Sequence, residues 1–105
     1  MHVQIINFNL KGISEQDYTR LCEDLAPAFA GLPGLMKKVW LADRDAGRFG
    51  GVYLWEDRQA MERFTQTDLF HAVATHPNLA EITSHDFDVL EGPTRVTRGI
   101  VGVLA

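Results

Sequence analysis

The sequence predicts an α+β fold, with one antiparallel sheet covered on one face by helices. Three observations support this prediction: four stretches with strand-like apolar alternation, two segments with helical apolar spacing, and the order strand, helix, strand, strand, helix, strand along the chain. That order is typical of a ferredoxin-like βαββαβ sandwich. The length of 105 residues fits a single domain over residues 1–105, whose core leaves much surface uncovered.

The first strand is expected at residues 2–10 and the first helix after it. Val3, Ile5, Asn7 and Asn9 share one face of the strand, and Gln4, Ile6, Phe8 and Leu10 share the other. Ser14, followed by Asp17, resembles a capping box and opens the helix. Pro27 is expected to kink or end the helix, because proline lacks a backbone N–H.

The stretch from Gly50 to Asp57 organises the predicted fold, because an aromatic strand that begins at Phe49 runs directly into the N-cap of the next helix. Tyr53 and Trp55 share one face and Val52 and Leu54 the other, so both faces avoid water. Residues 43–48 form a polar hairpin loop back to the strand at 35–42. In the register we favour, Val39 lies opposite Val52, with Leu35, Leu41 and Leu54 on this aliphatic face and Met36, Trp40 and Phe49 on the aromatic face.

The second half of the chain is predicted to hold two short helices, a fourth strand and an apolar tail. Asp57 caps the first helix and Asp68 the second. The fourth strand spans residues 82–90, with His85 and Phe87 on its apolar face. Residues 94–105 form a β-prone apolar tail. Two helices cannot cover both apolar faces of the sheet, so we expect a homodimer in which the tail packs on the partner chain.

Composition excludes several classes of function. The net charge is −4 and the basic residues do not cluster, which argues against nucleic acid as a partner. A single cysteine excludes an internal disulfide, and no apolar run is long enough to span a membrane, so we expect a cytoplasmic protein. Phosphate-binding glycine loops and nucleophile elbows are absent. His71 and His76 would lie about 140° apart on a helix, a poor pair for a metal ion.

Several runs of the sequence resemble the dimeric α+β barrel superfamily of antibiotic-biosynthesis and haem-degrading monooxygenases. These runs are Val-Tyr-Leu-Trp-Glu-Asp at 52–57, the helix that follows it, and Thr-Asp-Leu-Phe at 67–70. The runs at 34–40, 50–57 and 87–89 resemble more closely its YdhR-like branch. The resemblance covers roughly residues 1 to 98 and implies a dimeric α+β barrel.

The resemblance also carries expectations about the site. In the haem-degrading relatives, an asparagine on the first strand, a tryptophan at the end of the third and a histidine on a later helix form the pocket. Asn7 and Trp55 match the first two, but the histidine's place falls on Ala74, so the haem ligand is missing. The resemblance therefore implies oxidation without haem, metal or another cofactor.

The predicted function is a cofactor-independent monooxygenase that oxidises a small aromatic or polyketide-like substrate with dioxygen. Asn7 and the Trp55 indole would donate hydrogen bonds to developing oxygen charge, and His71 would act as a base. We expect Asn7, Tyr53 and Trp55 to line one cavity between sheet and helices. The remaining predicted pocket residues are Trp40, Phe64, Phe70, His85 and Phe87. The alternative is a non-catalytic dimeric module that binds a small ligand, in which Asn7 satisfies a backbone group and Trp55 fills the core.

Overall fold

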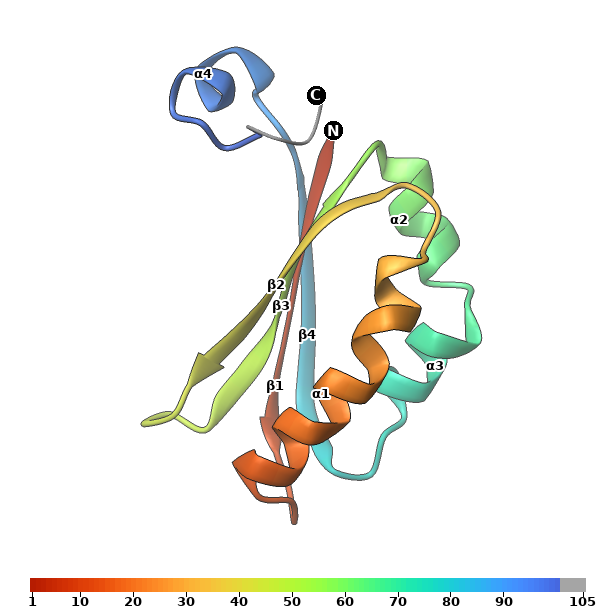
Figure 1. Ribbon diagram of the computed structural model, residues 1–105, viewed down its shortest axis with the longest axis vertical. Helices are drawn as coiled ribbons and strands as arrows, with labels where there is room; N and C mark the ends of the chain where they lie inside the picture. Colours follow the sequence, from red (N-terminus) through yellow and green to blue (C-terminus); the bar gives the residue numbers. More distant parts are fainter. Residues whose placement is uncertain (101–105) are drawn as a thin grey trace.

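A four-stranded antiparallel sheet carries three helices on one face (Figure 1). The computed structural model describes residues 1–100, and the strand order in the sheet is β2-β3-β1-β4. This is the predicted α+β fold with the predicted βαββαβ order, to which a fourth helix is added. The elements are β1 (His2–Leu10), α1 (Glu15–Ala30), β2 (Leu35–Asp43), β3 (Arg48–Trp55), α2 (Arg58–Phe64), α3 (Asp68–Ala74), β4 (Leu79–Asp88) and α4 (Glu91–Val96).

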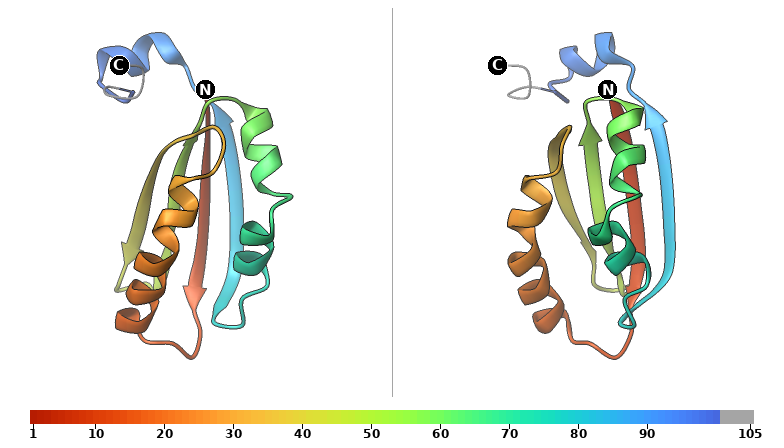
Figure 2. Two further views of the ribbon diagram at one scale, coloured as in Figure 1. Left: turned by 45° about the vertical axis from the view of Figure 1, so that its right-hand side comes forward. Right: turned by 90° about the vertical axis from the view of Figure 1, so that its right-hand side faces the viewer.

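The two faces of the sheet differ in what covers them (Figure 2). In β1 the even-numbered residues from His2 to Phe8 are buried, and their partners in β3 include Tyr53 and Trp55. Residues directly opposite each other in an antiparallel pair share a face, so this face packs under the helices. The odd-numbered residues of β1 lie on the other face, which we call the open face.

The β2–β3 hairpin has the predicted pairing of Val39 with Val52. Val39 therefore lies on the open face and Trp40 on the helix face, as expected. A register shift between Leu35 and Lys37 changes the start of the strand, where Leu35 pairs with Trp55 and packs on the helix-side core. The expectation that Leu35 joins the open aliphatic face is wrong. A β-bulge between Leu35 and Lys37 reverses the alternation of side chains, so Leu35 lies on the helix face.

Helix α1 begins where the sequence predicts and runs beyond Pro27. Ser14 Oγ accepts a hydrogen bond from the Asp17 backbone N–H at 3.1 Å. Pro27 lies in the last turn, and the helix continues to Ala30. The helix does not end at Pro27, because the buried Phe29 holds the last turn in the core and offsets the one backbone hydrogen bond that the proline removes.

Helices α2 and α3 both begin with side-chain caps. Asp57 Oδ1 accepts from the Ala60 N–H at 2.8 Å, as predicted. The cap of α3 is Thr67, whose hydroxyl accepts from the Phe70 N–H at 3.1 Å. Asp68, the predicted cap, is instead the first helical residue, where its carboxylate still complements the helix dipole.

The C-terminal part differs most from the prediction. Strand β4 spans Leu79–Asp88, so it begins and ends earlier than the expected 82–90. Residues Glu91–Val96 form helix α4 and no strand, with Pro93 in its first turn, where a missing N–H costs nothing. An Arg95–Glu91 ion pair of 3.0 Å supports this turn. The expected β-prone tail is thus wrong for residues 94–96, and residues 101–105 lie outside the described part.

Strands β3 and β1 approach closely at Gly50, and a substitution there tests this approach. The φ of Gly50 is +152°, and a Cβ would collide with the Ile6 carbonyl oxygen and lie 2.9 Å from Asn7 Cα. Gly50→Ala should therefore cost about 3 kcal/mol or more in the free energy of unfolding, measured by urea denaturation. Gly47→Ala is the matched control, because its φ is +66° but its Cβ would meet nothing within 4 Å, so only about 1 kcal/mol of backbone strain is expected. Equal losses in the two variants would contradict the tight packing at Gly50.

Candidate functional site

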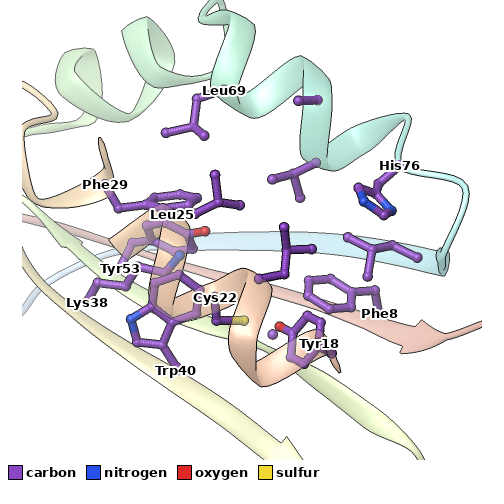
Figure 3. A pocket seen from close by; sticks show the side chains of 15 residues that line it. Phe8, Tyr18, Cys22, Leu25, Phe29, Lys38, Trp40, Tyr53, Leu69 and His76 are labelled. Atoms are coloured by element: carbon purple, nitrogen blue, oxygen red, sulfur yellow. The ribbon is translucent and has the colours of Figure 1, made fainter. Parts of the chain in front are cut away.

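A cavity lies on the helix face between the sheet, α1 and α3 (Figure 3). Its volume is about 90 Å³. Its walls are mainly aromatic and aliphatic side chains from the four strands, α1 and α3. The lining residues are Phe8, Tyr18, Leu21, Cys22, Leu25, Phe29, Lys38, Trp40, Gly50, Tyr53, Leu69, Ala72, Val73, His76 and Leu79.

Lys38 is the one residue among these lining residues that is a lysine, an arginine or an acidic residue. Its Nζ lies 3.3 Å from the ring centroid of Phe29, 3.4 Å from that of Trp40 and 4.6 Å from that of Tyr53. The structure gives it no ion pair within residues 1–100. Burial lowers the pKa of the Lys38 ammonium to about 7, with a nearby Cys22 acting in the opposite direction. The cavity therefore holds an amine that exists in both protonation states near neutral pH.

The thiol and the two tyrosine hydroxyls of the cavity stay neutral at neutral pH, because burial raises the pKa of each. Burial raises the pKa of the Cys22 thiol, and the Tyr18 side chain that bonds to it only partly opposes this. Burial also raises the pKa of both the Tyr18 and the Tyr53 hydroxyl above the ordinary range. Cys22 is thus no thiolate nucleophile at neutral pH.

His76 lies at the other end of the cavity from Lys38 (Figure 3). It follows the end of α3, and its Nδ1 accepts a hydrogen bond from the Asn78 backbone N–H at 3.1 Å. An Nδ1 that accepts leaves the proton of the neutral ring on Nε2, so His76 offers the cavity an N–H donor.

Trp55 is part of the aromatic core behind the cavity and does not line it. Its indole is fully buried and stacks on Tyr53, with ring centroids 5.9 Å apart and planes at 2°. The indole N–H donates to Gln4 Oε1 at 3.2 Å, so it has a partner within the core. Phe64 and Phe70 also pack in this core, with their own centroids 5.2 Å apart. Of the predicted pocket residues, Trp40 and Tyr53 line the cavity.

Asn7 does not share a cavity with Trp55, so that expectation is wrong. Asn7 pairs with Gly50, and Ile5, two residues earlier on the same face of β1, pairs with Val52. The side chain of Asn7 therefore lies on the open face, with Ile5 and Val52. Its amide donates to the Phe49 carbonyl oxygen at 3.3 Å. The match of Asn7 to the family position therefore brings no donor into the cavity of this chain.

The remaining predicted residues also lie outside the cavity. His71 is exposed on α3 and does not line the cavity. The histidine that lines the cavity is His76, five residues later. His85 and Phe87 pair with Ile5 and Val3, so they lie on the open face, where the Phe87 side chain is 56% exposed. Their apolar strand face, identified correctly from the sequence, faces away from the helices.

The residues present do not fit a histidine-ligated haem at the family position. Ala74, which takes that position, is exposed on α3 and carries no ligating atom. Within residues 1–100, no three histidine, cysteine or carboxylate side chains gather in a way that would hold a metal ion. No helix of the described residues is long and apolar enough to cross a membrane.

The fold places the chain among small α+β proteins in which helices cover one face of an antiparallel sheet. Solved structures of this fold include the haem degrader MhuD from Mycobacterium tuberculosis, with 19% identity and a TM-score of 0.68 over 86% of this chain and 96% of that one. SnoaB, a cofactor-independent oxygenase from Streptomyces nogalater, matches with 22% identity and a TM-score of 0.67 over 86% and 94%. NE2512, a protein of unknown function from Nitrosomonas europaea, matches with 13% identity and a TM-score of 0.72 over 85% and 88%.

A family model identifies the branch. The model described as "Putative mono-oxygenase ydhR" matches residues 3–100. The chain belongs to this family, as its sequence motifs predict. Among curated proteins, none matches the chain.

The lowered pKa of Lys38 should appear in the pH dependence of stability. Between about pH 7 and its ordinary pKa of 10.5, the unfolded chain binds the Lys38 proton and the folded chain does not, so this group makes stability rise with pH. Lys38→Met removes the effect. The free energy of unfolding of the variant minus that of the wild type should therefore fall from pH 7 to pH 9, by up to about 1 kcal/mol per unit, because the partial exposure of the group reduces the ideal slope.

Urea denaturation at pH 6, 7, 8 and 9 measures this difference. Lys37→Met is the matched control, because Lys37 pairs with Leu54 and lines the hollow of the open face. A difference that stays constant with pH for Lys38→Met would mean that the amine keeps its ordinary pKa.

Proposed function

We propose that the protein is a cofactor-independent monooxygenase that oxidises a small aromatic substrate with dioxygen in the cavity of the helix face. The observation that carries the proposal is a cavity with aromatic walls and only a few polar groups, in a chain of a mono-oxygenase family. Flat aromatic substrates can stack on such walls, and the apolar lining excludes water from reactive intermediates.

The substrate supplies the electrons in this reaction. An activated CH₂ group becomes a carbonyl, one oxygen atom of O₂ enters the product, and the other leaves as water with the two hydrogen atoms. The protein must bind the electron-rich form of the substrate and stabilise negative charge on oxygen. We assign the second role to the Nε2–H of His76, in place of the predicted donors Asn7 and Trp55, because His76 lines the cavity.

Removal of the His76 donor should lower the rate of oxidation. We expect His76→Phe to reduce kcat for oxygen uptake by about a hundredfold, as loss of one oxyanion donor does. His71→Phe is the matched control and should leave the rate unchanged, because His71 is exposed outside the cavity. The measurement is oxygen uptake with anthrones, quinols and other phenols in the presence of a chelator, with melting temperatures recorded for each variant.

The same assay separates the proposal from its alternative, a non-catalytic ligand-binding module. Uptake that requires an added metal or flavin would contradict the cofactor-independent reaction. Binding of these compounds without any oxygen uptake would favour the binding module.

We further propose that two copies of the chain pack by their open faces. A hollow on this face is lined by Val3, Val39, Val52 and Leu54, and the Val39 side chain is 57% exposed. Thr94 and Ile100 border the same hollow, so the segment after β4 lies beside the proposed interface. Ile100 is buried on its own chain, whereas Val96 is 79% exposed and supports the proposed packing of the tail, residues 94–105, on the partner. An apolar sheet face of this kind is typical of an interface.

A charge in the middle of the open face should separate the two copies. Val39→Lys is expected to raise the dimer dissociation constant about a hundredfold or more, because the interface would bury an unpaired ammonium. Ala46→Lys places the same charge in the exposed β2–β3 turn as a control. Sedimentation equilibrium at micromolar concentrations measures the change. A wild-type protein that is monomeric at these concentrations would end the dimer proposal.

A further inference from the structure

We propose that the cavity binds flat aromatic molecules that carry an acidic hydroxyl, and that Lys38 takes the proton of this hydroxyl and remains beside the oxyanion as its counter-ion. The step moves one proton from the substrate oxygen to Nζ, so a neutral amine and a hydroxyl become an ammonium and an oxyanion. The inference rests on the proposed function, because it names the substrate class of the same site and the group that activates it.

The position of Lys38 supports this assignment. Its partners within residues 1–100 are the faces of three rings, Phe29, Trp40 and Tyr53. Ring faces stabilise an ammonium by cation–π attraction but accept no proton and offer no lone pair. No carboxylate of residues 1–100 pairs with the amine, so an incoming oxyanion would be its first ionic partner in this part of the chain.

The groups that face Lys38 in the cavity leave it as the proton acceptor. Tyr18 and Cys22 from α1 and Tyr53 from β3 have pKa values raised by burial, so they stay protonated. His76 on the α3 side carries its proton on Nε2 and acts as a donor. Burial lowers the pKa of Lys38 to about 7, so a large share of the amine is neutral at physiological pH.

The same rings that hold the ammonium define the shape of the ligand. A planar aromatic molecule would lie against Trp40 and Tyr53 with its oxygen near Nζ, because these two rings and Lys38 lie together at one end of the cavity (Figure 3). A molecule without an acidic hydroxyl would gain the stacking but not the ionic hydrogen bond. Charge-assisted hydrogen bonds of this kind are worth about 1.5–3 kcal/mol, which corresponds to about ten- to a hundredfold in affinity.

Binding of 2-naphthol and of 2-methoxynaphthalene tests the proposal without turnover. Wild-type protein should bind 2-naphthol about tenfold more tightly than its methyl ether, measured by quenching of tryptophan fluorescence. The absorption of bound 2-naphthol should shift to that of the naphtholate at a pH at least about one unit below the value in free solution.

Variants at Lys38 and Lys37 identify the responsible group. Lys38→Met and Lys38→Gln should both lose the tenfold preference and the naphtholate absorption, whereas Lys37→Met should keep both. Two different substitutions, each checked by melting temperature, keep the test valid if one of them folds poorly. A Lys38 variant that keeps the preference, or a wild type that binds neither compound or binds neutral 2-naphthol only, would overturn the proposal.

Oxygen uptake distinguishes failure of the inference from failure of the proposed function. If wild-type protein oxidises a substrate, its kcat/KM should rise with pH through about 7, as Lys38 loses its proton, and Lys38→Met should lack this rise. Turnover with the same pH profile in Lys38→Met would overturn the inference but keep the oxygenase. Lys38-dependent ionisation of 2-naphthol with no oxidation of any substrate would keep the inference and end the oxygenase.

Discussion

Aromatic packing between the sheet and the helices is the interaction on which the rest of the structure depends. The ring of Phe64 from α2 lies 5.4 Å from that of Tyr53 and 5.2 Å from that of Trp55, and Phe29 from α1 lies 6.1 Å from Phe64. These contacts fix both helices on one face of β3. The indole of Trp55 remains satisfied because Gln4 accepts its N–H and donates in turn to Ser84 at 3.2 Å. The cavity then forms where this packing ends, between α1 and α3.

The sequence predicts the sheet well where two neighbouring strands share a short turn. The polar loop at 43–48 limits the possible registers of β2 and β3, so the pairing of Val39 with Val52 follows from the sorting of aliphatic and aromatic residues. Strands β1 and β3 are separated by a helix and another strand, and nothing in either strand fixes their register. The structure pairs Gln4 with Tyr53, so even-numbered residues of β1 share a face with odd-numbered residues of β3. Asn7 was therefore assigned to the wrong face.

Sequence reasoning missed Lys38 and His76, the two cavity residues with proposed chemical roles, for different reasons. Lys38 lies two positions before Trp40 in β2, so alternation alone places it on the aromatic face. A lysine on an aromatic strand face was the sequence signal that could have identified Lys38 as a cavity residue. For His76 no such signal exists, because α3 ends at Ala74 and the chain turns back to β4. Helical spacing from His71 therefore does not describe where His76 lies. In the tail, β propensity predicted no helix for residues 94–96, but local contacts such as the Arg95–Glu91 ion pair hold them in one.

The two faces of one sheet thus serve different purposes in the proposed molecule: a ligand site under the helices and a partner surface on the open face. The most direct test of this division is a crystal structure of the protein grown with 2-naphthol. We expect electron density for the ligand in the cavity between α1 and α3, with its oxygen within about 3 Å of Lys38 Nζ. A ligand bound on the open face instead, or in the cavity with its oxygen turned away from Lys38, would contradict the assignment of the site.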